Sequence, residues 1–153
     1  MRLKTIAGLV TPGYTVADIG TDHGYVPLLL LKNSIVPTAI ASDMSPGALA
    51  KAVENARRMG LEDKVDFRCC NGLEKISPGE AQCIVISGMG GILMRRILDE
   101  GLETVLAAKE LILSPHRDPE LILEFLETNG FETVSDQMIE DKKKKYRIIK
   151  GIH

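Results

Sequence analysis

The stretch Asp18-Ile19-Gly20-Thr21-Asp22-His23-Gly24 decides the fold of this chain. It ends a short β-type run, 15–19, and precedes a mostly apolar stretch of helical length, 26–31. The sequence therefore predicts a strand, a glycine-rich turn and a helix in succession. In an open α/β sheet such a turn lies at the carboxyl end of a strand, beside the point where the strand order reverses and ligands bind.

The spacing and charge of this turn indicate its ligand. Gly20 and Gly24 form a G-x-x-x-G pattern, which differs from the G-x-G-x-x-G pattern of dinucleotide-binding turns. Asp18 and Asp22 would repel phosphates, but their carboxylates can hold an ammonium group. S-adenosylmethionine has an amino group and a sulfonium and no phosphate. We therefore expect these four residues and Thr21 to bind this cofactor; the alternative is a tight turn in which Asp22 is the helix N-cap.

Runs of strand-like and helix-like composition alternate outward from this turn. Further strands are expected at 39–42, 65–69, 83–87 and 111–114, and helices at 46–59, 90–100 and 119–126. Ser45 is the expected N-cap of the second helix, Pro46 its first residue and Gly60 its stop. The alternation predicts a mainly parallel sheet with helices on both faces.

The last strands depart from this alternation. Phe131 to Gln137 and Tyr146 to Ile152 are two strand-like runs joined only by a polar stretch, so they should pair antiparallel. Rossmann-like methyltransferases end their sheet with such a hairpin, whereas nicotinamide-binding relatives usually continue to alternate helix and strand. The predicted fold is α/β, a Rossmann-like class I methyltransferase with a mainly parallel seven-stranded sheet and a C-terminal antiparallel hairpin.

Two more strand ends carry candidate cofactor-binding residues. Asp43, followed by Met44, comes roughly 20 to 25 residues after the glycine turn, where an acidic side chain can accept hydrogen bonds from both ribose hydroxyls. An aspartate before Ser-Pro could equally be a capping residue. Asn71-Gly72 follows the third expected strand, where a polar side chain typically contacts the adenine amine, although Asn-Gly is also a favourable turn.

The fourth expected strand leads into Gly88-Met89-Gly90-Gly91. Because glycine lets other groups approach the backbone closely, this segment predicts contact with the methyl acceptor. Gly88 is also a candidate cofactor contact, and Gly88, Met89 and Gly90 are candidate catalytic residues. The alternative is that Gly90 and Gly91 only loosen the start of the next helix.

Two histidines face the same expected rim of the sheet. His23 is a candidate catalytic residue because histidine titrates near neutral pH, although it could equally hold the turn in place. His116 follows the fifth expected strand and is a candidate substrate contact, whereas His153 is expected at a frayed terminus. The chain shows no Ser-His-Asp arrangement, P-loop or metal-ligand spacing, so no metal is expected.

The densest basic patch consists of Lys142, Lys143, Lys144 and Lys145. Arg147 and Lys150 continue it along the same expected hairpin, far from the glycine turn. Such a run is often a solvated turn, but it could also attract RNA phosphates. The net charge of −2 gives no overall attraction to nucleic acid, so any RNA binding would be local.

Composition bounds the remaining possibilities. The 153 residues, 44% of them hydrophobic, match one ordinary domain, 1–153, that buries a core without disulfides or metal. Residues 1–10 lack the apolar core of a signal peptide and no apolar run approaches the roughly 18 residues of a membrane span, so a cytoplasmic protein is expected. Cys69, Cys70 and Cys83 have no CxxC spacing and are expected to be reduced and buried.

Three blocks together resemble one known family. VADIGTDHGYVP at 16–27, AIASDMSPGALAKAVEN at 39–55 and IVISGMGG at 84–91 closely resemble the bacterial tRNA adenine-N1 methyltransferases that act on position 22, and LILSPH and EDKKKKYRI follow in the family's order. The resemblance covers essentially all 153 residues, which correspond to the family's catalytic domain without its helical C-terminal extension. The family tends to have Asp-Gly at Asn71-Gly72 and a Gln-Pro-Asn-like motif at 114–116.

The resemblance implies methylation of adenine N1 in tRNA with S-adenosylmethionine. Adenine N1 has an in-plane lone pair, so placing it in line with the sulfonium methyl matters more than a strong base. The base must be unpaired or extruded, held near 88–91, with Tyr25 as the nearest stacking candidate. Asp22 would act as a candidate catalytic residue by stabilising the cationic product. The alternatives are methylation of a small molecule or protein, and a cofactor-binding module whose catalysis needs a partner.

Overall fold

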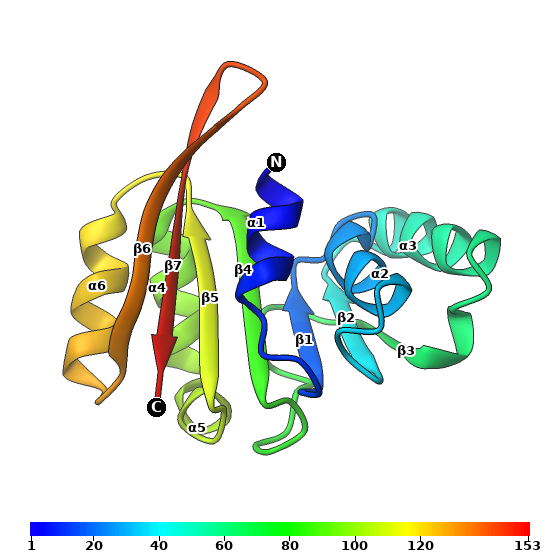
Figure 1. Cartoon of the computed structure of the whole chain (residues 1–153). Helices are drawn as coiled ribbons and strands as arrows, with labels where there is room; N and C mark the ends of the chain where they lie inside the picture. Colours follow the sequence, from blue (N-terminus) through cyan, green and yellow to red (C-terminus); the bar gives the residue numbers. More distant parts are fainter.

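A seven-stranded sheet with the order β3-β2-β1-β4-β5-β7-β6 forms the centre of the computed structural model, which describes residues 1–153 (Figure 1). Its strands are β1 (Val16–Ile19), β2 (Ala39–Asp43), β3 (Val65–Cys69), β4 (Cys83–Met89), β5 (Glu110–Pro115), β6 (Glu132–Asp141) and β7 (Lys144–Ile152). The first five strands in this order pair parallel, and β7 pairs antiparallel with both β5 and β6. The predicted mixed sheet with a C-terminal antiparallel hairpin is confirmed.

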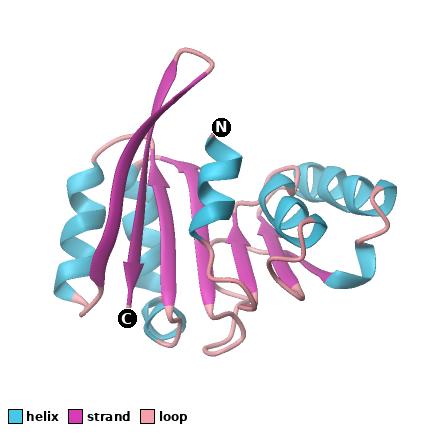
Figure 2. Ribbon diagram, viewed as in Figure 1, coloured by secondary structure: helices cyan, strands magenta, loops and turns pink.

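Helices cover both faces of the sheet (Figure 2). They are α1 (Arg2–Leu9), α2 (Tyr25–Lys32), α3 (Pro46–Arg58), α4 (Gly91–Glu100), α5 (Leu102–Leu106) and α6 (Pro119–Thr128), with a 3-10 helix at Glu62–Lys64. Residues of α1, α2 and α3 pack in one buried cluster, and residues of α4, α5 and α6 pack in another. The parallel sheet is thus enclosed between two layers.

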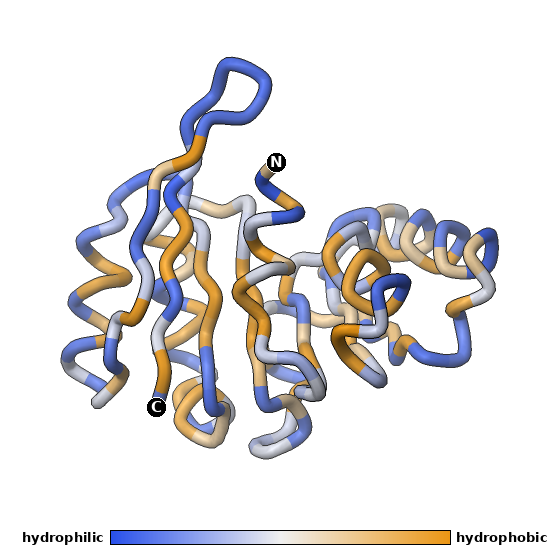
Figure 3. Tube along the Cα trace, in the orientation of Figure 1, coloured by the Kyte–Doolittle hydropathy of each residue, from blue (hydrophilic) through white to orange (hydrophobic).

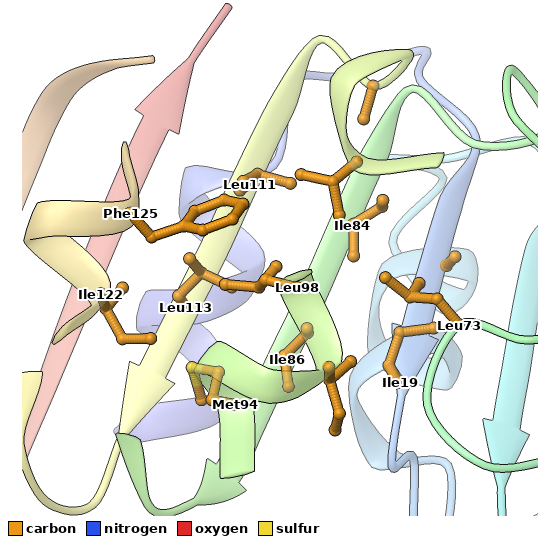
Figure 4. Close-up of a cluster of buried hydrophobic side chains, with 14 of the residues drawn as sticks. Ile19, Leu73, Ile84, Ile86, Met94, Leu98, Leu111, Leu113, Ile122 and Phe125 are labelled. Carbon is orange, nitrogen blue, oxygen red and sulfur yellow. The ribbon is translucent and has the colours of Figure 1, made fainter. Parts of the chain in front are cut away.

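Successive side chains of the central strands point to opposite faces of the sheet, so each strand contributes residues to both clusters. On β4, Ile84 and Ile86 face α4 and α6, whereas Cys83 and Val85 face the layer of α1 and α2. Because both faces of the strand are covered, its residues read as a continuous apolar run rather than as alternating polar and apolar residues. Figure 4 shows the cluster on the α4 side, where Phe125 of α6 packs among aliphatic side chains of the sheet.

The predicted capping of α3 is confirmed. Ser45 is the N-cap and its hydroxyl accepts a hydrogen bond from the Ala48 amide at 3.2 Å, while Pro46 opens the helix. Gly60 follows the helix with φ +69°, the left-handed conformation that glycine adopts without strain. By contrast, α1 and α5 were not predicted, because segments of eight and five residues show too few turns for a clear helical period.

The terminal hairpin is longer than predicted. Its strands extend to Asp141 and from Lys144, so the polar stretch is not a loop; only Lys142 and Lys143 turn, with φ of 51° and 65°. Positive φ at both central residues is the geometry of the tight turn that suits twisted antiparallel strands. This end of the hairpin projects beyond the sheet, and its hydrophilic tip meets solvent (Figure 3). Its strands can therefore consist of polar residues.

Candidate functional site

A cavity of about 390 Å³ lies at the carboxyl ends of β1, β2 and β4. The predicted site residues that line it are Asp18, Gly20, Thr21, Asp22, Tyr25, Asp43, Met44, Asn71, Gly72, Gly88 and Met89. Those that do not are His23, Gly24, Gly90, His116 and the lysines of the hairpin. Four chain segments separated in sequence thus meet in one cavity at the edge of the sheet where open α/β folds bind ligands.

The glycine turn is shaped by two different glycines. Gly20, with φ +71°, faces the cavity, and a Cβ there would lie 2.5 Å from Met89 Cε. Gly24, with φ +77°, packs against α3, where a Cβ would lie 3.1 Å from Ala52 Cβ. Gly24 is also the N-cap of α2, so the alternative in which Asp22 caps this helix is wrong. Asp22 itself has φ +55° and an exposed side chain.

Asp18 is a buried carboxyl group at the base of the cavity. Only 2% of the residue is exposed, and the Thr21 hydroxyl donates a hydrogen bond to Asp18 Oδ2 at 2.8 Å. Burial raises the pKa of Asp18 to about 7; the Thr21 hydrogen bond opposes this rise and the negative charge of Asp43 adds to it. A cation placed beside Asp18 would favour its ionised form.

Asp43 ties two turns together at the end of β2. Its Oδ2 accepts a hydrogen bond from the Asp22 amide at 2.9 Å, and its Oδ1 accepts one from the Ser45 amide at 2.9 Å. The two interpretations of Asp43 are therefore compatible, because each carboxylate oxygen has two lone-pair sites and keeps one for a ligand hydroxyl. Asn71 is exposed, and its side-chain amide makes no hydrogen bond within the protein.

The glycines after β4 differ in what surrounds them. Gly88 interrupts the pairing of β4 with β5, has φ +82° and lines the cavity; a Cβ there would lie 3.9 Å from His116 Nε2. Gly90 is the N-cap of α4 and has open space around it. At Gly91 a Cβ would lie 2.5 Å from the carbonyl oxygens of Arg117 and Asp118. Close packing of the backbone, not ligand contact, therefore accounts for Gly91.

His23 lies beside the cavity and does not line it. Its Nε2 is 3.6 Å from Asp22 Oδ1, and its ring meets the Tyr25 ring edge-on at 5.7 Å between centroids. The side-chain amide of Asn55 donates a hydrogen bond to the His23 carbonyl at 3.0 Å, so α3 also holds this turn. The geometry places His23 as a neighbour of two lining residues.

Arg2 is a lining residue that sequence reasoning missed. Its guanidinium carbon lies 4.7 Å from the centroid of the Tyr146 ring on β7, and the Tyr146 ring meets the His116 ring at 6.2 Å. The Arg2 amide donates a hydrogen bond to Asp141 Oδ2 at 3.2 Å. The hairpin therefore reaches the cavity indirectly, because two of its residues contact a residue that lines it.

The basic patch is smaller than predicted. The lysines at 142–145 are exposed, but Arg147 is engaged by Asp136 through two hydrogen bonds of 2.8 and 2.7 Å. Lys150 is mostly buried, with Nζ 3.4 Å from Glu110 Oε1 and donating to the Leu9 carbonyl at 2.7 Å. Arg147 and Lys150 therefore do not extend the patch, since both charges are used within the protein.

The cysteines also require a correction. Cys70 and Cys83 are buried as expected, but Cys69, the last residue of an outer strand of the sheet, is exposed. Burial and the neighbouring carboxyl of Glu110 raise the pKa of the Cys83 thiol well above its usual value. No cluster of three or more metal-ligating side chains occurs, and none of the helices is long and apolar enough to cross a membrane.

Several proteins that are similar to this chain in sequence and fold are methyltransferases. The tRNA (adenine(22)-N(1))-methyltransferase of Bacillus subtilis is 33% identical over 148 residues, which cover 97% of this chain and 62% of that protein. The crystal structure of the B. subtilis enzyme superposes with a TM-score of 0.93 at 32% identity, covering 99% of this chain and 64% of the other. Sp1610 of Streptococcus pneumoniae, in complex with S-adenosyl-L-methionine, gives a TM-score of 0.94 at 34% identity, covering 99% and 71%.

The similarity covers nearly all of this chain but only part of the B. subtilis protein. This chain spans less than two thirds of the length of the B. subtilis protein. The family model described as "Methyltransferase domain" matches residues 1–149, which include every strand that contributes to the cavity. The chain therefore belongs to the methyltransferase domain family.

Proposed function

We propose that this chain uses S-adenosylmethionine to methylate N1 of the adenine at position 22 of tRNA. The observation that carries the proposal is the single cavity into which Asp18, Asp43 and Asn71 converge from the ends of three neighbouring strands. The similarity to tRNA (adenine(22)-N(1))-methyltransferase over 97% of the chain supports the choice of acceptor. We also propose that 1–153 acts as one catalytic domain and works in the cytoplasm, where its substrate is found.

The cavity fits the chemistry of the proposed cofactor. Asp18 offers a carboxylate to the ammonium group, and Asp43 offers an unused lone pair on each oxygen to the ribose hydroxyls. Asn71 has a free amide for the polar edge of adenine. Gly20 leaves space that a side chain would fill. When bound, S-adenosylmethionine supplies an electrophilic methyl group on its sulfonium.

The acceptor would enter beside Gly88 and His116. A planar base fits there because Gly88 has no side chain and lies next to the imidazole of His116 on the exposed rim. Since adenine N1 carries its own lone pair, these residues need only position the base in line with the methyl group. Asp22, exposed at the mouth of the cavity, would stabilise the positive charge that methylation creates on the base.

Mass spectrometry of nucleosides tests the proposal directly. The protein would be incubated with S-adenosylmethionine and unmodified tRNA, and the digested tRNA would be searched for 1-methyladenosine and its position. We expect 1-methyladenosine at position 22, and none with a tRNA that has guanosine there. Methylation of metabolites or proteins but not RNA would contradict the acceptor. Cofactor binding without turnover on any acceptor would instead favour a module that needs a partner.

A further inference from the structure

We propose that Arg2 binds the carboxylate of the cofactor's methionine moiety and that the terminal hairpin holds Arg2 in position for this contact. The inference rests on the proposed use of S-adenosylmethionine and assigns a residue to the one part of that molecule which the predicted site residues leave without a partner. Asp18, Asp43 and Asn71 account for the ammonium, the ribose and the adenine. None of them carries a positive charge that could pair with the carboxylate.

The charges around the cavity single out Arg2. The acidic residues that line it are Asp18, Asp22 and Asp43, and Arg2 is the only cationic residue among all those that line it. A ligand carboxylate in this surrounding would be repelled by the aspartates unless a cation faced it. A guanidinium presents paired N–H donors whose spacing matches the two oxygens of a carboxylate. Arg2 is therefore the group in this cavity that suits the anionic end of a zwitterion.

The Arg2 side chain is held in place while its donors remain free. The guanidinium stacks over the Tyr146 ring at 4.7 Å, a contact that fixes the side chain without using its N–H groups. The backbone amide of Arg2 is anchored to Asp141 at 3.2 Å. No hydrogen bond or salt bridge within the protein involves the guanidinium of Arg2, in contrast to Arg147, whose guanidinium is paired with Asp136. This arrangement is suited to binding an external anion.

The hairpin thereby contributes to a cavity that its own residues do not line. Asp141 ends β6 and Tyr146 lies on β7, so both strands contact the beginning of α1. Figure 1 shows the start of α1 beside the part of the hairpin that projects from the sheet. Tyr146 and Asp141 are thus positioning residues, because each acts on the ligand only through Arg2.

Calorimetry with two ligands isolates this contact. S-adenosylhomocysteine retains the amino-acid moiety, whereas 5′-methylthioadenosine has the same adenosine and thioether without it. Arg2→Gln should weaken binding of S-adenosylhomocysteine by about 10- to 100-fold, the usual cost of losing a charge-assisted hydrogen bond. Binding of methylthioadenosine should change less than about twofold, because that ligand has no carboxylate. Lys4→Gln removes a charge from the exposed side of the same helix and should leave both affinities unchanged.

Variants of the hairpin test its role in positioning. Tyr146→Leu should lower the affinity for S-adenosylhomocysteine in the same direction as Arg2→Gln and spare methylthioadenosine. Tyr146→Phe keeps an aromatic ring under the guanidinium and should behave as the wild type. Circular dichroism would verify that each variant is folded. In the Arg2→Gln background, Tyr146→Leu should have no additional effect on affinity, because the two residues act as one unit.

The outcomes separate the inference from the proposed function. If the wild type binds neither ligand, the proposed use of S-adenosylmethionine fails and the inference fails with it. If the wild type binds both and Arg2→Gln weakens both equally or neither, only the assignment of Arg2 is overturned. A rise in the Michaelis constant for tRNA with unchanged affinity for S-adenosylhomocysteine would instead place Arg2 on the RNA.

Discussion

At the scale of single residues, the buried carboxyl of Asp18 makes ligand binding dependent on pH. Its pKa in the protein is about 7, and the proposed ammonium partner requires the ionised form. Below pH 7 binding must therefore remove a proton from Asp18, and affinity for S-adenosylmethionine should fall about tenfold for each pH unit. Calorimetry between about pH 5.5 and pH 7 tests this, with Asp18→Asn expected to bind more weakly at all pH values and without the slope. A wild-type affinity that is constant over this range would contradict the role of Asp18.

The same carboxyl should affect the stability of the free protein in the opposite direction. Because the pKa of Asp18 is raised from 3.8 to about 7, the folded state retains a proton that the unfolded state has released. The free energy of unfolding contributed by this group should therefore be highest below about pH 4 and decline as the pH rises to about 7. Urea unfolding of the wild type and Asp18→Asn across this range should show that the variant lacks this decline.

Asp43 allows a second test of a single side chain. Asp43→Ala should weaken binding of S-adenosylmethionine by roughly 2 to 3 kcal/mol, because charge-assisted hydrogen bonds to the ribose are lost. Since Asp43 also accepts hydrogen bonds from the Asp22 and Ser45 amides, the loss should include some loosening of both turns. Calorimetry gives the affinity and urea unfolding gives the change in stability. An unchanged affinity would rule out contact with the ribose.

Site residues could be predicted from the sequence where neighbouring residues in the chain determine their position. Asp18, Asp43 and Asn71 each lie at or just beyond the carboxyl end of a strand. Because the carboxyl ends of parallel strands share one edge, their meeting follows from the order of elements. Arg2 reaches the cavity because α1 is anchored to a hairpin 139 residues away along the chain. A pattern of neighbouring residues in the sequence does not indicate a contact between segments so far apart. Cys69 was misplaced for a related reason, because the sequence does not show which strand end is exposed.

At the scale of elements, the turn between β4 and α4 offers a matched pair of glycine substitutions. Gly90 has open space around it and an ordinary φ of −70°, so a bulky residue such as leucine should fold normally. We predict that Gly90→Leu preserves cofactor affinity but abolishes methyl transfer, because the side chain would fill the place of the acceptor. Calorimetry and a methylation assay measure the two effects. Full activity in this variant would place the acceptor away from Gly90.

The neighbouring glycine should respond in the opposite way. Gly91→Ala would place a methyl group 2.5 Å from two carbonyl oxygens, so the backbone before α6 must move. We expect a loss of roughly 1 to 3 kcal/mol in stability from this overpacking. Thermal unfolding should show it, whereas Gly90→Ala should leave the midpoint nearly unchanged.

The hairpin lysines test whether the acceptor is RNA. If 142–145 contact phosphates, tRNA binding should weaken steeply with salt, because each neutralised phosphate releases counterions. Changing all four lysines to glutamine should flatten this salt dependence and raise the Michaelis constant for tRNA. Affinity for S-adenosylmethionine should be preserved because Asp141 and Tyr146, which contact Arg2, are retained. Filter-binding assays at several salt concentrations measure the slope.

A matched quadruple variant controls for the loss of net charge. It changes four exposed lysines on other elements, namely Lys32, Lys51, Lys64 and Lys75. This variant should keep the wild-type salt slope if binding is local to the hairpin. If the hairpin variant also methylates tRNA with an unchanged salt profile, the lysines form only a solvated turn and RNA docks elsewhere.

At the scale of the whole molecule, one buried ion pair connects distant parts of the chain. Glu110 is 2% exposed, faces Lys150 at 3.4 Å and accepts hydrogen bonds from the amide and hydroxyl of Thr11 at 2.9 and 2.6 Å. Lys150→Met should destabilise the protein by about 3 kcal/mol, because the Glu110 charge would remain buried without its partner. Lys145→Met, on the exposed part of the same strand, is the matched control. Urea unfolding should separate the two variants.

The central strands of the sheet could be predicted more completely from the sequence than the hairpin at its edge. The central strands are short apolar runs that end in polar or glycine residues, so their positions along the chain and their parallel pairing follow from composition and connection rules. The hairpin strands carry charged residues on their exposed parts. Because these residues obscure the strand pattern, four residues of β6 and two of β7 were not predicted as strand. Their pairing is stabilised by contacts across the hairpin, which a pattern along one strand does not reveal.

The sheet order also constrains when the protein can fold during its synthesis. β7 is the last strand of this chain to be made, yet it lies between β5 and β6. Until the ribosome has released it, β5 has no neighbour on one side and exposes backbone groups that are buried in the finished fold. Such an open apolar edge is the kind of surface on which nascent chains associate with each other or with chaperones. The sheet described here therefore cannot close over this edge of β5 before β7 has been translated.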